Sequence, residues 1–225
     1  MPEFPPARDQ PIETSTLSKV VNASGRLIIG LTGGIATGKS TASQYLASLG
    51  ADILDADVYA RQAVEIDSSI WQKIVQHYGT RICLASGQIN RAMLGEIIFT
   101  QPAERAWLES LIHPYVRDRL RQELATLSRS SAVVMVIPLL FEAGMKDLVN
   151  RIWVVYCPPS IQLKRLMSRD HLTLEQAQAR IASQMPLAEK MSRADVVLNN
   201  SSTPAELCRQ IKLTWQTIFP DSKLG

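Results

Sequence analysis

The sequence predicts an α/β fold in which helices flank a five-stranded parallel sheet. Three observations support this prediction. A complete phosphate-binding pattern lies between an apolar run and an amphipathic stretch, further short apolar runs alternate with helical stretches, and one long helical segment interrupts the alternation. Continuous apolar runs are typical of strands in a parallel sheet that is covered on both faces.

The five strands are expected where short apolar runs occur, at 27–32, 52–54, 132–137, 152–157 and 195–198. The first helix follows the glycine-rich stretch. Ala42, Tyr45, Leu46 and Leu49 have the spacing of an amphipathic stripe, and Gly50 ends it. Segments 27–57, 128–159 and 191–220 are therefore expected to form one core.

Two helical segments stand apart from this core. Residues 58–127 carry apolar side chains at helical spacing and are interpreted as an insertion, in which Pro114 is expected to kink a long helix. Residues 160–190 form a second, more polar segment. Its later part is predicted to open with a capping box between Thr173 and Gln176 and to end near Pro186.

The composition is ordinary for a globular protein: 46% of the 225 residues are hydrophobic, 20% are charged, and the formal net charge is +3. This mild charge indicates no nucleic-acid partner. We also expect no membrane partner, because the longest apolar stretch, 132–141, is too short to span a bilayer. The composition leaves the oligomeric state open.

The cysteines and the N-terminal stretch bear on the cellular compartment of the protein. Cys83, Cys157 and Cys208 lie far apart, and neither they nor the three histidines have metal-ligand spacing. This favours free thiols in a cytoplasmic protein. Residues 1–26 contain four prolines and no apolar signal-peptide core, so we expect a disordered leader.

The glycine-rich stretch fits the pattern GxxxxGK[ST] in full. Its glycines let backbone N–H groups turn toward a bound anion, and the following helix adds its positive N-terminal end. Lys39 is expected to reach the β- and γ-phosphates of a nucleotide, and the Ser40 hydroxyl to hold Mg²⁺. The residues predicted to bind ATP are Gly33, Gly34, Ala36, Thr37, Gly38, Lys39, Ser40 and Thr41.

Two carboxylates follow the second strand, at Asp55 and Asp57. Because ligands of open α/β sheets bind beyond the carboxyl ends of the strands, both are expected near the phosphates. One could accept the proton of an attacking hydroxyl, and the other, which we take as Asp55, could help to hold Mg²⁺. The alternative for Asp55 is a helix N-cap, a position that Asp favours.

Arg165 and Arg169 are spaced to face the same way from one helix, so they could close over a triphosphate. A solvated face with Asp170 beside Arg169 is the equally weighted alternative. Arg180 and Arg193 are weaker candidates of the same kind. In the insertion, Arg91 could meet a substrate phosphate or be a surface charge.

Taken in order, these motifs resemble the dephospho-CoA kinase family over residues 27–215. The motifs are GLTGGIATGKST (30–41), LDADVYARQAV (54–64), GQINRAML (87–94), LIHP (111–114), VIPLLFE (136–142), QLKRLMSRD (162–170) and RADVVLNN (193–200). The resemblance implies a P-loop kinase fold whose insertion binds coenzyme A and whose segment 160–190 is a lid. It also implies phosphorylation of the ribose 3′-hydroxyl of dephospho-CoA by ATP and Mg²⁺.

The resemblance also implies roles for individual residues. Asp57 would activate the acceptor hydroxyl, and Lys39, Arg165 and Arg169 would complete the catalytic group. His113 is expected to shape the acceptor site without acting as a catalyst. The residues expected to bind the acceptor are Asp57, Arg61, Arg91, His113 and Arg117.

The chain departs from the usual family pattern at three places. Ala36 and Thr37 stand where Gly and Ser are usual, and the Cβ of Ala36 predicts a backbone that does not need a glycine-like φ. The segment 199–202, expected near the adenine, lacks the usual carboxylate and glycine. Asn90 replaces a common Asp.

Two other functions share parts of this pattern. A nucleoside monophosphate or shikimate kinase would have a similar core and a different acceptor site within 58–127. A GTPase-type switch would carry NKxD-like and DxxG segments, which the sequence lacks.

Overall fold

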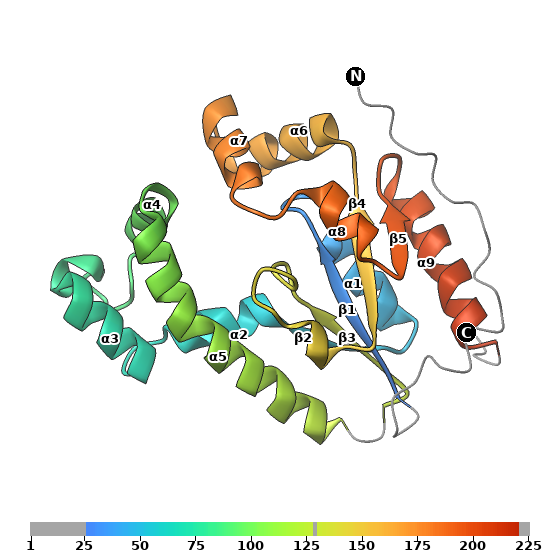
Figure 1. Cartoon of the computed structure of the whole chain (residues 1–225), viewed down its shortest axis with the longest axis horizontal. Coiled ribbons are helices and arrows are strands. Elements are labelled where there is room, and N and C mark those ends of the chain that lie inside the picture. The colour runs from blue at the N-terminus through green and yellow to red at the C-terminus, as the bar shows by residue number, and fades with distance from the viewer. Residues whose placement is uncertain (1–25, 128–129, 221–225) are drawn as a thin grey trace.

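The computed structural model describes residues 26–127 and 130–220, so the predicted leader lies outside the described residues except for Arg26 (Figure 1). The prediction of a five-stranded parallel sheet is confirmed, with the strand order β2-β3-β1-β4-β5. Every neighbouring pair of strands is parallel. The strands are β1 (Leu27–Gly33), β2 (Asp52–Asp55), β3 (Ala132–Val136), β4 (Arg151–Tyr156) and β5 (Val196–Asn199).

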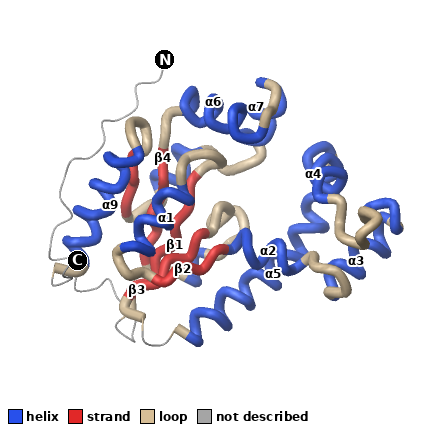
Figure 2. Tube along the Cα trace, turned by 180° about the vertical axis from the view of Figure 1, so that it is seen from behind, coloured by secondary structure: helices blue, strands red, loops and turns tan. Residues whose placement is uncertain are grey.

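Side chains on the two faces of β1 enter different hydrophobic cores. Leu27, Ile29 and Leu31 pack on the face covered by α1 (Lys39–Ser48) and α9 (Pro204–Ile218), where Trp215 is buried. Figure 2 shows α1 lying across the strands on this face. Ile28 packs on the opposite face, with buried side chains of α2 (Ala56–Ala63) and α5 (Pro102–Thr126). Both faces are therefore covered, as the continuous apolar runs require.

The helices between β2 and β3 extend away from the sheet and enclose a small core of their own (Figure 1). They are α2, α3 (Ser69–Tyr78), the 3₁₀ turn η2 (Thr80–Ile82), α4 (Arg91–Thr100) and α5. The 25-residue helix α5 serves both cores: Leu108 is buried in the small one, and Leu120 against the sheet. It continues as one helix past Pro114, where the sequence predicts a kink.

The segment 160–190 contains most of α6 (Pro159–Asp170), all of α7 (Leu174–Ala182) and the start of α8 (Leu187–Ser192). The predicted capping box between Thr173 and Gln176 is confirmed. We call α6, α7 and α8 the lid helices, after the lid that the resemblance implies for this segment. A 3₁₀ turn, η3 (Lys146–Leu148), precedes β4. Within the described part of the chain, no helix is long and apolar enough to cross a membrane.

Candidate active site

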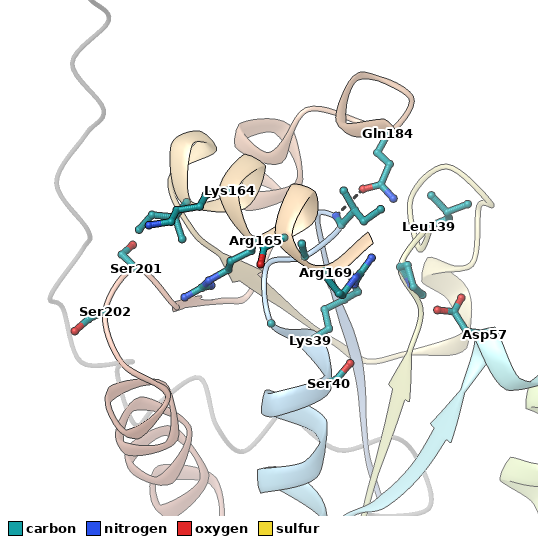
Figure 3. Close-up of a pocket in the computed structure, with 16 residues that line it drawn as sticks. Lys39, Ser40, Asp57, Leu139, Lys164, Arg165, Arg169, Gln184, Ser201 and Ser202 are labelled. Carbon is teal, nitrogen blue, oxygen red and sulfur yellow. Dashed lines mark hydrogen bonds between the residues drawn. The ribbon is translucent and has the colours of Figure 1, made fainter. Parts of the chain in front are cut away.

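A cavity of about 980 Å³ opens at the carboxyl ends of the strands, between the glycine-rich loop and the lid helices (Figure 3). This is the edge at which open α/β sheets bind ligands. It is lined by Ile35, Ala36, Gly38, Lys39, Ser40, Asp57, Pro138, Leu139, Ile161, Lys164, Arg165, Ser168, Arg169, Gln184, Ser201 and Ser202.

The glycine-rich loop joins β1 to α1, which is the context that the phosphate-binding pattern requires. Gly38 has φ 106°, and a Cβ there would collide with the side-chain amide of Asn200. That amide donates to the Thr37 carbonyl at 2.8 Å, and the Thr37 hydroxyl donates to the Gly34 carbonyl at 2.9 Å. The loop is thus fixed before any anion binds, with the N-terminus of α1 open to the cavity.

Ala36 adopts a left-handed backbone with φ 58°, so the prediction that this position avoids a glycine-like conformation is wrong. Such a conformation costs a non-glycine residue about 1–2 kcal/mol. The neighbouring Ile35 peptide is held on both sides by the lid helices and their connection. Its N–H donates to Gln184 at 2.9 Å, and Gln162 donates to its carbonyl at 2.8 Å. These contacts offset part of the strain at Ala36.

Lys39 lies at the base of the cavity and is turned back onto its own loop. Its ammonium group donates to the carbonyls of Gly34 at 2.8 Å and Gly33 at 3.2 Å. Burial, assisted by the nearby ammonium of Lys190, lowers the pKa of Lys39 to about 8, although Asp57 opposes the shift. An anion bound in the cavity would favour the charged form of this lysine.

Asp55 and Asp57 have different surroundings although they are two residues apart. The Asp55 carboxylate caps α2 by accepting the N–H of Asp57 at 2.8 Å, so the N-cap alternative is confirmed. Asp57 lines the cavity, but it is buried enough that the loss of hydration raises its pKa. Asp55 adds to that increase, whereas Lys39 and Arg61 oppose it. Asp57 is thus a stronger base than a free aspartate.

Arg165 and Arg169 both line the cavity, as their spacing predicts, and Figure 3 shows Arg169 beside Lys39. Arg169 also contacts Asp170, with its Nε 2.7 Å and its terminal nitrogen 3.1 Å from the two carboxylate oxygens. The Asp170 neighbour that the second alternative expects is therefore present, and closure of the two arginines over a triphosphate stays a prediction. Arg165 lies near Cys157, where burial raises the thiol pKa and Arg165 opposes that increase.

The remaining residues expected at the acceptor site do not line this cavity. Arg61 and Arg91 are neighbours, since Arg91 donates weakly to the Arg61 carbonyl at 3.5 Å. Arg117 pairs with Asp147 at 2.7 Å and donates to the Gly144 carbonyl at 2.6 Å, which ties α5 to the turn before β4. His113 is half-buried, and burial lowers its pKa.

Sequence reasoning missed Lys190, which the structure places in the wall behind Lys39. It is fully buried, and its ammonium group lies 2.9 Å from both the Pro138 carbonyl and the Glu142 carboxylate. Burial would raise the pKa of Glu142, but hydrogen bonds from Lys190 and the Met185 N–H keep it below its usual value. A lysine in a polar helical segment gives no sequence signal of such burial.

The described residues fit a magnesium ion that is held jointly with a nucleotide. They contain no group of three or more His, Cys, Asp or Glu side chains that could hold a metal alone. Mg²⁺ usually takes one or two carboxylates together with substrate phosphates and water. The Ser40 hydroxyl lines the cavity with Asp57, and the Asp55 oxygen that does not cap α2 is left as a further acceptor.

The family model and the curated relatives indicate the same family. The dephospho-CoA kinase family matches residues 27–206. The chain is 58% identical over 187 residues to the dephospho-CoA kinase of Trichormus variabilis, a match that covers 83% of this chain and 95% of the other. Among solved structures, a protein of Thermus thermophilus matches with a TM-score of 0.72 at 34% identity, covering 84% of this chain and 96% of the other.

The dephospho-CoA kinase of Campylobacter jejuni matches with a TM-score of 0.64 at 30% identity, covering 86% of this chain and 98% of the other. The family match spans the glycine-rich loop, both aspartates and the lid helices. The chain therefore belongs to the dephospho-CoA kinase family.

Proposed function

We propose that this chain transfers the γ-phosphate of ATP to the ribose 3′-hydroxyl of dephospho-CoA, giving coenzyme A and ADP, the last step of coenzyme A synthesis. Family membership supports the reaction. The observation that carries the residue assignment is the placement of Asp57 on the same cavity as Lys39, with a raised pKa. A base and a phosphate-binding cation thus face one space.

Asp57 accepts the proton of the 3′-hydroxyl as the oxygen attacks phosphorus. A base is more effective as its pKa approaches the working pH, and burial together with Asp55 moves the pKa of Asp57 in that direction. The Asp57 N–H donates to the capping carboxylate of Asp55, which fixes the backbone from which the base projects. Asp55 therefore positions the base and strengthens it.

Phosphoryl transfer is catalysed mainly by positioning and by neutralising charge on the transferred group. The loop amides and Lys39 hold the phosphates from the core side, and Arg165 and Arg169 approach them from the lid helices. Mg²⁺, when bound with ATP, neutralises phosphate charge, and Ser40 and Asp55 would hold it. Of the loop residues predicted to bind ATP, Ala36, Gly38, Lys39 and Ser40 line the cavity, which supports their part in this proposal.

The acceptor is proposed to lie between the cavity and the helices of the insertion. Asp57 lies at the cavity end of this acceptor site, and Arg61 lies one helical turn further along α2. Arg61 and Arg91, which lie together, form a cationic pair suited to an acceptor phosphate. Arg117 and His113 act on this site from α5, by supporting its wall.

An acceptor panel tests the proposal. ADP release is measured with dephospho-CoA, AMP, CMP and shikimate, and the product is examined by ³¹P NMR for a new 3′-phosphomonoester. We expect turnover with dephospho-CoA alone, above the acceptor-free ATPase rate. Turnover only with a nucleoside monophosphate or with shikimate would refute the proposal.

A further inference from the structure

Four side chains form a continuous path from the insertion to the cavity. The Arg180 guanidinium on α7 lies over the Phe99 ring on α4, 5.4 Å from its centroid. The same guanidinium donates to Asp170 at 2.9 Å, and Asp170 holds Arg169 through both carboxylate oxygens. Arg169 lines the cavity, whereas Arg180 does not. Figures 1 and 2 both show α7 on the side of the molecule where α4 lies.

The position of Asp170 shows that these pairs are more than ordinary surface contacts. Asp170 is the last residue of α6, where the negative end of the helix disfavours a carboxylate. The pKa of Asp170 is nevertheless lowered, first by the hydrogen bond from Arg169 and then by the charges of Arg169 and Arg180. Exposed ion pairs matter mainly when the geometry is bidentate or several charges form a network, and both conditions are met here.

Arg169 needs such a partner because 57% of its side chain is exposed. A long side chain with that freedom samples many rotamers, so its placement beside Lys39 depends on what holds its guanidinium. Asp170 holds it in a fork geometry, and Arg180 donates to the Oδ2 oxygen of Asp170 that also accepts from the terminal nitrogen of Arg169. The direction of Arg169 is therefore set by α7 as well as by α6.

Phe99 connects this arrangement to the acceptor side. Phe99 is 54% exposed, which is unusual for a phenylalanine on a short helix whose other apolar side chains pack into the insertion core. A guanidinium over an aromatic face is favourable because the ring carries negative charge on that face. The contact exists only while α4 and α7 stand close, so it reports the spacing between the insertion and the lid helices.

We propose that Arg180 is a positioning residue through which the acceptor-binding insertion sets the placement of Arg169 at the phosphates. This inference rests on the proposed function. When an acceptor fixes α4, Phe99 docks Arg180, Arg180 fixes Asp170, and Asp170 directs Arg169 into the cavity. Because binding energies are linked reciprocally, acceptor and nucleotide each tighten the binding of the other by the same factor.

The test compares Arg180→Gln, Phe99→Leu and their double variant with the wild type, using kcat, both KM values and the Kd of an unreactive ATP analogue with and without dephospho-CoA. We expect Arg180→Gln to lower kcat roughly threefold to thirtyfold, the range typical of residues that carry coupling. Phe99→Leu should lower it roughly twofold to fivefold, as expected for one exposed cation–π contact. The double variant should lose no more than Arg180→Gln alone.

Three variants serve as controls. Arg209→Gln, which removes an ion pair of α9 away from the cavity, should leave kcat unchanged. Arg180→Lys keeps the charge for Asp170 and should restore part of kcat without restoring the coupling to Phe99. Phe99 is exposed, so Phe99→Leu tests the path even if Arg180→Gln is unstable.

The inference is overturned if folded Arg180→Gln keeps the wild-type kcat and the wild-type effect of dephospho-CoA on analogue binding. Additive losses in the double variant would also overturn it, because the two residues would then act separately. Failure of the proposed function has a different signature, since the wild type itself would not phosphorylate dephospho-CoA.

Discussion

The ammonium group of Lys190, on α8, lies 2.9 Å from the carboxylate of Glu142, on the loop that follows β3. The same ammonium donates to the Pro138 carbonyl, which lines the cavity, and Glu142 also accepts the Met185 N–H at 2.9 Å. Lys190 is fully buried. This pair therefore joins the lid helices to the wall of the cavity and places a positive charge behind Lys39.

Replacing Lys190 with Met should lower the free energy of unfolding by about 1–3 kcal/mol, because the Pro138 carbonyl loses its donor and the Glu142 carboxylate, whose side chain is 20% exposed, loses its partner. Urea unfolding followed by circular dichroism measures this. Changing Glu142 to Leu in the same protein should recover part of the loss. Arg193→Gln, which breaks the exposed pair between Glu189 on α8 and Arg193 at the C-cap of that helix, should cost no more than about 1 kcal/mol. A loss that small for Lys190→Met would show that the pair does not stabilise the fold.

Asp57→Asn should abolish most transfer and keep nucleotide binding. Loss of a general base lowers turnover about 10²–10⁴-fold, while the loop contacts that hold the phosphates stay intact. Turnover by coupled ADP release and ATP-analogue binding by calorimetry measure the two effects. Wild-type turnover in the variant would show that another group takes the proton.

Asp55→Asn should move the acid limb of kcat/KM to lower pH. Asparagine caps a helix as well as aspartate does, so the variant keeps the cap and removes the charge. Saturating Mg²⁺ is used throughout, because Asp55 is also proposed to help to hold that ion. That charge raises the pKa of Asp57, and the base must be unprotonated to act, so activity would fall at a lower pH than in the wild type. A pH–rate profile checks this, and an acid limb that stays in place would contradict it.

ATP affinity should decline above a pH of about 8, where the Lys39 ammonium of the free protein loses its proton. The charged form binds the phosphates, so the affinity should be constant below this pH and should fall as the pH rises further. Calorimetric titrations across this window measure the effect. An affinity that is unchanged on the alkaline side would show that Lys39 remains charged there.

Ala36→Gly should raise the free energy of unfolding by at most about 1.6 kcal/mol. Glycine removes the left-handed strain of about 1–2 kcal/mol. It also raises the conformational entropy of the unfolded chain, which lowers the free energy of unfolding by about 0.4–1 kcal/mol. Gly38→Ala is the opposite case, because its Cβ would collide with Asn200. We expect that variant to lose both stability and nucleotide binding. Destabilisation by Ala36→Gly would mean that Ala36 carries no strain.

The fold was largely predictable because its signals are local. Buried parallel strands require continuous apolar runs, and each of the five runs forms a strand within one or two residues of the predicted bounds. The capping box at Thr173 was likewise readable, since it depends on residues three apart. The backbone conformation of Ala36 could not be predicted from the sequence, because neighbours distant in sequence hold it in a conformation that alanine alone disfavours.

The sequence by itself determined the sheet, the phosphate loop and the spacing that brings Asp57 and the two lid arginines to one cavity. These features follow from residue type and from periods of a few residues. Only the tertiary structure decided which charges meet. Lys190 contacts Glu142, and Arg180 contacts Phe99 and Asp170, because helices from distant parts of the chain pack together. Burial and charge pairing depend on position in space, which no local pattern encodes.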